Sequence, residues 1–176
     1  AVQLDDAALL AKAQESAASY TGAKRSSHIL FNEEDQETAQ DVLKRIQTGE
    51  LAFEDAVAEY SQDEGSKENG GDVGWDRLSS FVTEYTDALA NLNKGEVTAE
   101  LVKSKYGYHI IMVTDVFEAP ETIESLDQVP SEILEEIRTT ASETDSETAM
   151  DDWLLEKKQT SDVTINPMPE NVPYDV

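Results

Sequence analysis

The longest run of strand-forming residues in the chain covers residues 108–116, and no other feature constrains the fold as much. The turn sequence Lys-Tyr-Gly at 105–107 comes directly before it. A shorter run of the same kind, at 98–102, lies on the other side of that turn. The two runs therefore predict a pair of antiparallel strands joined by a short turn.

Another strand is predicted far away in the sequence, at residues 26–31. Because side chains alternate between the two faces of a strand, His28 and Leu30 would point one way and Ile29 the other. The chain holds two histidines in all, and the second, His109, lies in the long run described above. Any imidazole chemistry near neutral pH therefore depends on these two residues.

Helices are predicted wherever apolar residues recur at helical spacing. The clearest covers 34–47, because its apolar residues share one face, acidic residues occupy its first turn, and Gly49 follows its end. The other predicted helices cover residues 1–22, 53–62, 83–92, 126–139 and 147–158. Glycines in 63–74 predict a loop, while 73–75 and 163–165 are predicted as short extended pieces, the latter before a Pro-rich end.

The balance of charge argues against one large class of function. The chain holds 38 Asp and Glu against 13 Lys and Arg, a formal net charge of -25, which would repel a nucleic-acid backbone. Without cysteine there is neither a disulfide framework nor a thiolate nucleophile. No window is apolar enough for a membrane span, and the first residues lack the features of a secretory signal, so an export signal is expected to be removed or absent.

Five sequence blocks, taken in order and at their spacing, are more informative than any one of them. They are SSHILF from Ser26, then a helix, then FEDAVAEYSQDEGSKENGGDVGW from Phe53, YTDALANLNKGEV from Tyr85 and KYGYHIIMVTD from Lys105. In this order they resemble the parvulin family of peptidyl-prolyl cis-trans isomerases over residues 24–117. The acidic helices on either side resemble the flanks of PrsA-type extracellular foldases.

The resemblance implies an α+β fold, in which about four helices surround a four-stranded antiparallel sheet. It divides the chain into an N-terminal helix at 1–22, an isomerase domain at 24–117, and a C-terminal helical segment with an extended tail at 120–176. The first and last segments would pack together as a small flanking lobe. Their apolar surface is a candidate for homodimerisation or segment exchange.

The resemblance also implies a catalytic site built around the two histidines. His28 and His109 match the paired histidines of the family, which hydrogen-bond to each other and orient the other groups. Ser104 matches the hydroxyl-bearing partner of that pair, and Tyr106 matches the residue before the turn glycine. Asp63 falls where some parvulins have cysteine and bacterial foldases have aspartate. No metal, nucleotide or redox cofactor is implied.

Three further residues, Val73, Phe81 and Tyr85, would form an apolar cup for the proline ring. They stand where the family usually has leucine, methionine and phenylalanine. Their alternative role is core packing, since a pocket wall and a core look alike in sequence. Asp63 has three alternatives: an ionised carboxylate beside the substrate carbonyl, a protonated carboxyl that donates a hydrogen bond, and a carboxylate that only caps a helix or loop.

The expected activity is isomerisation of Xaa-Pro bonds in unfolded, unphosphorylated, exported polypeptides. Phosphate-directed parvulins carry basic residues in the loop after the first strand, but here that loop is NEEDQE and would repel a phosphate. The competing hypothesis is a non-catalytic chaperone module that binds extended peptides in the same groove and between the flanking helices, and a third is an acidic scaffold. The expected location is extracellular or in the cell envelope, with a lipid anchor upstream of this chain.

Overall fold

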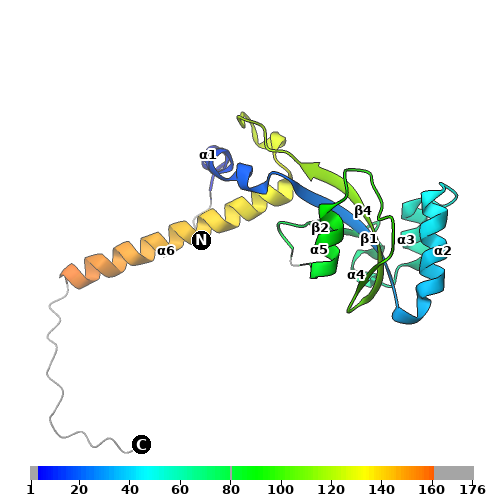
Figure 1. The fold of residues 1–176 in the computed structure, drawn as a ribbon. Coiled ribbons are helices and arrows are strands. Elements are labelled where there is room, and N and C mark those ends of the chain that lie inside the picture. Colours follow the sequence, from blue (N-terminus) through cyan, green and yellow to red (C-terminus); the bar gives the residue numbers. More distant parts are fainter. Residues whose placement is uncertain (1–3, 80, 161–176) are drawn as a thin grey trace, which may run out of the picture.

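A four-stranded antiparallel sheet forms the centre of the molecule (Figure 1). The computed structural model describes residues 4–79 and 81–160. The strand order is β2-β1-β4-β3, with β1 at Ala23–Phe31, β2 at Asp72–Trp75, β3 at Val102–Ser104 and β4 at Gly107–Phe117. The helices are α1 (Asp6–Ser16), α2 (Gln36–Gln47), α3 (Phe53–Tyr60), α4 (Glu64–Lys67), α5 (Thr83–Ala90) and α6 (Ser131–Thr160). The predicted α+β class with a four-stranded antiparallel sheet is confirmed.

The two faces of the sheet are covered by different helices. On one face, α2 and α3 pack against a core to which β1 and β4 contribute Ile29, Phe31, Tyr108 and Ile110. Figure 1 shows α5 on the other side of the sheet, where its residues pack against Ile111 and Val113 of β4. Both histidines lie on this second face, because His28 is paired with Ile111 and His109 with Leu30.

Two glycines allow neighbouring segments to approach β1 closely, one beside His28 and one at its last residue, Phe31. A Cβ atom on Gly71 would overlap the carbonyl oxygen of His28, and one on Gly107 would overlap the carbonyl oxygen of Phe31. Both glycines also have positive φ angles, of 75° and 131°, which L-residues rarely adopt. Only glycine therefore lets the segment before β2 and the start of β4 lie against β1.

Helices α1 and α6 pack against each other at one end of the sheet. Leu9 of α1 and Ile133 of α6 are buried in one apolar cluster with Trp75 of β2 and Phe117 of β4. The N-terminal helix is shorter than expected, since α1 ends at Ser16 and is followed by a 3₁₀ turn at Ala17–Tyr20. The flanking helices thus share a core with the ends of the strands.

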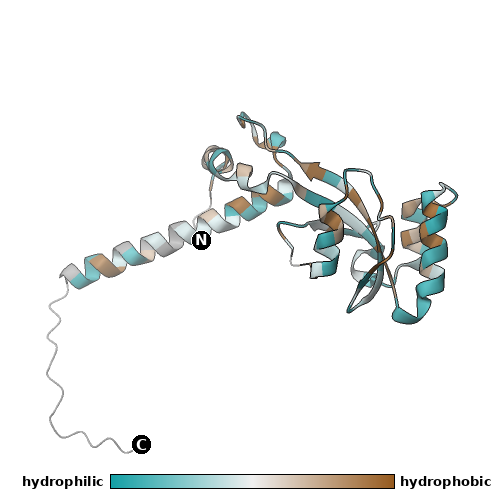
Figure 2. Cartoon of the chain, viewed as in Figure 1, coloured by the Kyte–Doolittle hydropathy of each residue, from teal (hydrophilic) through white to brown (hydrophobic). Residues whose placement is uncertain are grey.

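The structure corrects the prediction of two C-terminal helices at 126–139 and 147–158. A 3₁₀ turn at Leu126–Gln128 is followed by one continuous helix of 30 residues, α6. No proline or glycine interrupts it, so the helix continues through the polar stretch where apolar spacing lapses. Figures 1 and 2 show its far part extending away from the sheet, mostly hydrophilic but with an apolar patch near its end.

Two smaller predictions are also corrected. The expected loop at 63–74 contains the short helix α4 and the start of β2, and a third 3₁₀ turn covers Glu33–Asp35. The strand expected at 98–102 lies at Val102–Ser104, preceded by an isolated bridge between Val97 and Met112.

Two other predictions fall on the end of the chain, at 163–165 and in the Pro-rich segment after it. Both lie outside the described residues. Within 4–79 and 81–160, no helix is long and apolar enough to cross a membrane.

Candidate active site

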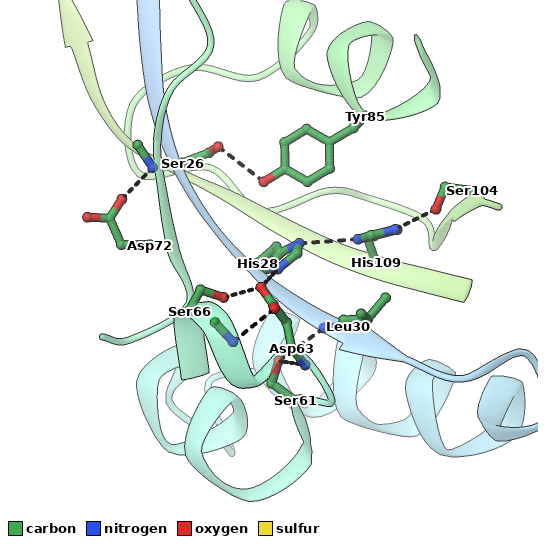
Figure 3. A network of polar contacts seen from close by, with 12 residues as sticks. Ser26, His28, Leu30, Ser61, Asp63, Ser66, Asp72, Tyr85, Ser104 and His109 are labelled. Atoms are coloured by element: carbon green, nitrogen blue, oxygen red, sulfur yellow. Dashed lines mark hydrogen bonds and ion pairs between the residues drawn. The ribbon is translucent and has the colours of Figure 1, made fainter. Parts of the chain in front are cut away.

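A line of hydrogen bonds, buried at the histidine pair and partly exposed at Asp63, connects four of the predicted site residues (Figure 3). His28 on β1 and His109 on β4 face each other, with their Nδ1 atoms 3.2 Å apart. Nε2 of His28 is 2.8 Å from Oδ2 of Asp63, and Nε2 of His109 is 2.7 Å from Oγ of Ser104. The two imidazole rings are stacked, with centroids 5.3 Å apart.

Asp63, at one end of the line, determines which atom donates in each of these hydrogen bonds. An ionised Asp63 accepts only, so Nε2 of His28 carries a proton and donates it. In a neutral His28 the Nδ1 atom is then bare and accepts from Nδ1–H of His109. Nε2 of His109 is bare in turn and accepts from the Ser104 hydroxyl, whose oxygen accepts the backbone N–H of Tyr106 at 3.1 Å. With both imidazoles neutral, every ring nitrogen has a partner.

Asp63 is held by more than one donor. Its carboxylate accepts from Ser66 Oγ at 2.5 Å and from the backbone N–H of Gly65 at 3.1 Å, in addition to His28. Burial raises the pKa of this carboxyl, but the hydrogen bonds from Ser66, His28 and Gly65 together outweigh it and hold the pKa below its ordinary value. Asp63 is therefore ionised near neutral pH, and it both caps α4 and contacts the histidine pair.

His109 is kept neutral by its surroundings. Burial lowers its pKa, and the neighbouring His28 lowers it further, to about 4, although the charges of Asp63 and Glu84 act in the opposite direction. A positive charge on this ring would also disrupt the line of hydrogen bonds, because a second N–H, at Nε2, would then face the Ser104 hydroxyl that donates to this atom. His109 is thus arranged to orient groups and not to take up a second proton at neutral pH.

A small cavity opens beside the histidine pair. Its volume is about 150 Å³, and it is lined by His28, Val73, Phe81, Val82, Tyr85, Tyr106 and His109. The Tyr85 ring meets both imidazoles edge-on, with centroids 5.8 Å from each, and lies 4.8 Å from the Phe81 ring. The aromatic wall and the imidazole floor therefore form one continuous surface.

Two tyrosines of the cavity differ in how they are held. Tyr85 is buried, its hydroxyl lies 3.1 Å from Oγ of the fully buried Ser26, and burial raises the pKa of its phenol. Tyr106 is 60% exposed, and the Lys105 ammonium lies 4.9 Å from its ring centroid. Tyr85 is thus a fixed wall, while Tyr106 stands at the open side.

All eight residues predicted from the sequence come together here. His28, Asp63, Ser104 and His109 form the polar line, while Val73, Phe81, Tyr85 and Tyr106 line the cavity. Sequence reasoning missed three contributors: Ser66, Ser26 and Val82. A signal for Ser66 was its position three residues after Asp63, where a helix-capping carboxylate finds partners. Among the described residues, no three His, Cys, Asp or Glu side chains gather as a metal site.

Comparisons with known proteins agree with this geometry. The family model of the PPIC-type PPIase domain, or rotamase, matches residues 28–115, half of the chain. Foldase protein PrsA of Geobacillus kaustophilus is 42% identical over 109 residues, which are 62% of this chain and 37% of that protein. Foldase protein PrsA 1 of Bacillus cereus is 35% identical over 142 residues, covering 81% of this chain and 46% of the relative.

The crystal structure of PrsA from Bacillus subtilis has the same fold. It superposes with a TM-score of 0.53 at 29% identity, over 88% of this chain and 56% of that one. The chain therefore belongs to the parvulin family of PPIC-type peptidyl-prolyl cis-trans isomerase domains, as predicted. Among its relatives are foldases named PrsA, and the chain spans less than half the length of the two described above.

Proposed function

We propose that the chain catalyses cis-trans isomerisation of Xaa-Pro bonds as part of a foldase. The observation that carries the proposal is the cavity of about 150 Å³, in which apolar walls meet a buried polar line. A cavity of roughly this volume holds a ring the size of benzene, and the pyrrolidine ring of proline is smaller. Membership of the PPIC-type family and the names of the PrsA relatives support the same activity.

The mechanism requires no covalent step. Rotation about the Xaa-Pro bond meets a barrier of about 18–20 kcal/mol, which arises from amide resonance. Val73, Phe81 and Tyr85 would hold the ring while the preceding carbonyl turns. The cavity would also exclude the water that stabilises the planar, charge-separated amide, so the twisted form would be bound better than either planar form.

The hydrogen-bonded line from Ser104 to Asp63 would determine the charge at the floor of the cavity. Because all its donors point toward Asp63, the two imidazole rings would be fixed in orientation. The ionised Asp63, whose side chain is 30% exposed beside His28, would disfavour partial negative charge on the substrate oxygen and so weaken the amide resonance. Tyr106 would cover the open side of the bound ring.

The substrates we propose are unfolded, unphosphorylated chains outside the cytoplasm. Glu33 and Glu34, in the turn after β1, are exposed, and Glu33 pairs with Lys103 at 3.4 Å. This turn would repel a phosphate before proline, while the net charge of -25 would favour neutral or basic clients.

A protease-coupled or NMR exchange assay on an Ala-Pro peptide tests the proposal. The protein should accelerate isomerisation, and Asp63→Ala and His109→Ala should each lower kcat/KM by roughly ten-fold or more, about 1.4 kcal/mol of transition-state stabilisation. Asp55→Asn, which alters an exposed carboxylate on α3, is the matched control and should leave the rate unchanged. A phosphoserine-Pro peptide should react more slowly than Ala-Pro. A wild-type rate equal to that of buffer would refute the activity.

A second function, peptide binding as a chaperone, is favoured by one observation on α6. Met150, Trp153, Leu154 and Leu155 are each at least 41% exposed, and they lie on the part of the helix that extends from the body (Figure 2). Large apolar side chains grouped on a surface mark interaction sites. The occupant we propose is an apolar segment of an unfolded client.

Aggregation of a proline-free client measures this second function separately from isomerisation. The wild type should slow the rise in light scattering, and Trp153→Gln with Leu154→Gln should abolish most of that protection without changing the peptide assay. Thr148→Gln, at an exposed position of the same helix, is the control. Sedimentation of the same proteins shows whether a second copy of the chain covers the patch; a wild-type dimer that the double variant disrupts would identify homodimerisation in place of client binding.

A further inference from the structure

We propose that Arg25 and Asp72 are positioning residues that together hold a β-bulge and thereby aim Val73 into the cavity. The proposal rests on the proposed function only in taking proline as the group that the cavity receives. Val73 is one of the apolar walls, and it lies on β2, a four-residue strand at the edge of the sheet. So short an edge strand cannot fix the direction of a side chain by its own pairing.

In the register between β1 and β2, no residue of β1 is paired with Val73. Ser26 lies opposite Gly74 and Ser27 lies opposite Asp72, so two residues of β1 face three of β2 and Val73 is the extra one. Gly74 has a φ of 79°, a conformation that glycine adopts without strain. A bulge of this kind bends the strand and redirects a side chain, and bulges are frequent beside active sites.

The Asp72 carboxylate stabilises this bulge from both sides. Its Oδ1 accepts the backbone N–H of Gly74 at 2.9 Å, which closes a turn around Val73. Nε and Nη2 of Arg25 donate to the same carboxylate at 3.1 and 2.6 Å. A guanidinium fork fixes both the position and the orientation of a carboxylate.

The charge of Asp72 is consistent with this role. Burial raises the pKa of its carboxyl, but the hydrogen bonds from Arg25 and Gly74 outweigh burial and hold the pKa below its ordinary value. The carboxylate is therefore ionised near neutral pH, where it can accept from the Arg25 guanidinium. Figure 3 shows Asp72 beside β1 and near Ser26. Ser26 and His28 lie on this same strand, β1.

Arg25 also connects the bulge to the flanking helix. Its Nη1 donates to Oε1 of Glu132, in the first turn of α6, at 2.6 Å. The residue lies on β1, three positions before His28. A single guanidinium thus joins the strand that carries His28, the strand that carries Val73 and the start of α6.

Removing this contact should misplace Val73 while the domain stays folded. Asp72→Ala loses both the fork and the acceptor for Gly74, so KM for a prolyl peptide should rise about ten-fold, with a smaller change in kcat. Asp72→Asn keeps an oxygen for Gly74 and Arg25→Gln removes the fork alone, so each should raise KM roughly three-fold. Arg25→Lys should recover part of the loss, because it restores one hydrogen bond but not the fork.

The experiment measures kcat, KM and the Val73 methyl resonances of each variant by NMR, with and without the prolyl peptide. The matched control is Arg45→Gln on α2, because the Arg45 side chain is 30% exposed against 32% for Arg25 and also contacts two carboxylates. Arg45 lies on the α2 side of the sheet, away from the cavity. Its variant should leave KM and the Val73 resonances unchanged even where its thermal stability falls by as much as that of Arg25→Gln.

Two outcomes would overturn the proposal. In the first, the Val73 resonances of folded Arg25→Gln and Asp72→Asn lie at their wild-type positions. In the second, KM rises as much in Arg45→Gln as it does in Arg25→Gln. Should Asp72→Ala fail to fold, the two milder variants decide the question. A wild type without isomerase activity would refute the proposed function alone. In that case the Val73 resonances and their response to the peptide still report on the bulge, and displaced resonances in the variants would support it.

Discussion

The two faces of the central sheet use the same two strands for different purposes. On the α2 and α3 side, the middle of β1 and β4 contributes Ile29 and Ile110, which are completely buried among other apolar side chains. On the α5 side, the preceding residue of each strand is a histidine, and its ring nitrogens are satisfied by other side chains. One face is stabilised by close packing, and the other is arranged by hydrogen bonds.

The packed face of the sheet determines where the residues of the hydrogen-bonded face lie. Because the side chains of a strand alternate, a slip of β1 by one residue would bring His28 into the apolar core and Ile29 into the cavity. The apolar face makes such a slip costly, since it would bury polar nitrogens without partners. Packing on the α2 side therefore fixes the register that places both histidines, although it contributes no atom to the site.

The largest effect is expected from a change on the apolar face. Ile29→Ala removes a completely buried side chain and leaves a cavity, which should cost about 3–4 kcal/mol of unfolding free energy in urea. At a temperature where the variant is folded, its kcat/KM should stay within about two-fold of the wild type, because no atom of the site is lost. Ile29→Val, the milder control, should cost about 1 kcal/mol. A ten-fold loss of kcat/KM in folded Ile29→Ala would show that the faces are not separable.

An effect of similar size is expected from pH on the polar face. Burial and His28 hold the pKa of His109 at about 4, below the 6.5 of an ordinary histidine. Between these values the unfolded chain binds more protons than the native one, so the free energy of unfolding should fall as the pH falls from about 6.5 to about 4. The loss should be on the order of 3 kcal/mol, and it should be complete below pH 4.

Urea unfolding at several pH values measures this loss, with His109→Gln as the control. The variant lacks the titrating ring, so its free energy of unfolding should depend less on pH over the same interval. Below pH 4 both proteins should lose the stability that the ionised Asp63 contributes, because the pKa of Asp63 is also lowered in the folded state. NMR titration of the His109 ring gives a direct check that does not depend on a variant. A His109 ring that titrates near 6.5 in the folded protein would contradict its being neutral and buried.

Much of the site was predictable because its residues lie in local patterns that a single sequence shows. His28 lies on a strand predicted from alternation and His109 in the longest run of strand-forming residues, and their match to the family placed Asp63 and Ser104 beside them. The helix α2 was predicted from its apolar spacing, and its acidic start and the glycine after its end agree with that. In each case, local spacing and long-range packing favour the same structure.

The features that were missed depend on contacts between distant residues, or are too short to show a period. The bulge at Val73 exists only because β2 pairs with β1, and α4 has four residues and a carboxylate cap. The continuity of α6 was missed for a different reason. Its middle has no apolar period, and the side chains that the structure describes there after Ser142 are exposed, yet no residue there ends a helix.

The smallest effect is expected from the hydrogen bond between Tyr85 and Ser26, because it does not shape the cavity. Tyr85→Phe keeps the ring against both imidazoles and removes only the hydroxyl beside the buried Ser26, so it should cost about 1 kcal/mol of unfolding free energy and change kcat/KM less than two-fold. Ser26→Ala should cost a similar amount. Because the loss in each single variant comes from a buried hydroxyl left without its partner, Tyr85→Phe with Ser26→Ala should cost no more than either alone. Additive losses in the double variant would mean that the two hydroxyls do not stabilise each other, and a large loss of activity in Tyr85→Phe would place the hydroxyl itself in the catalytic site.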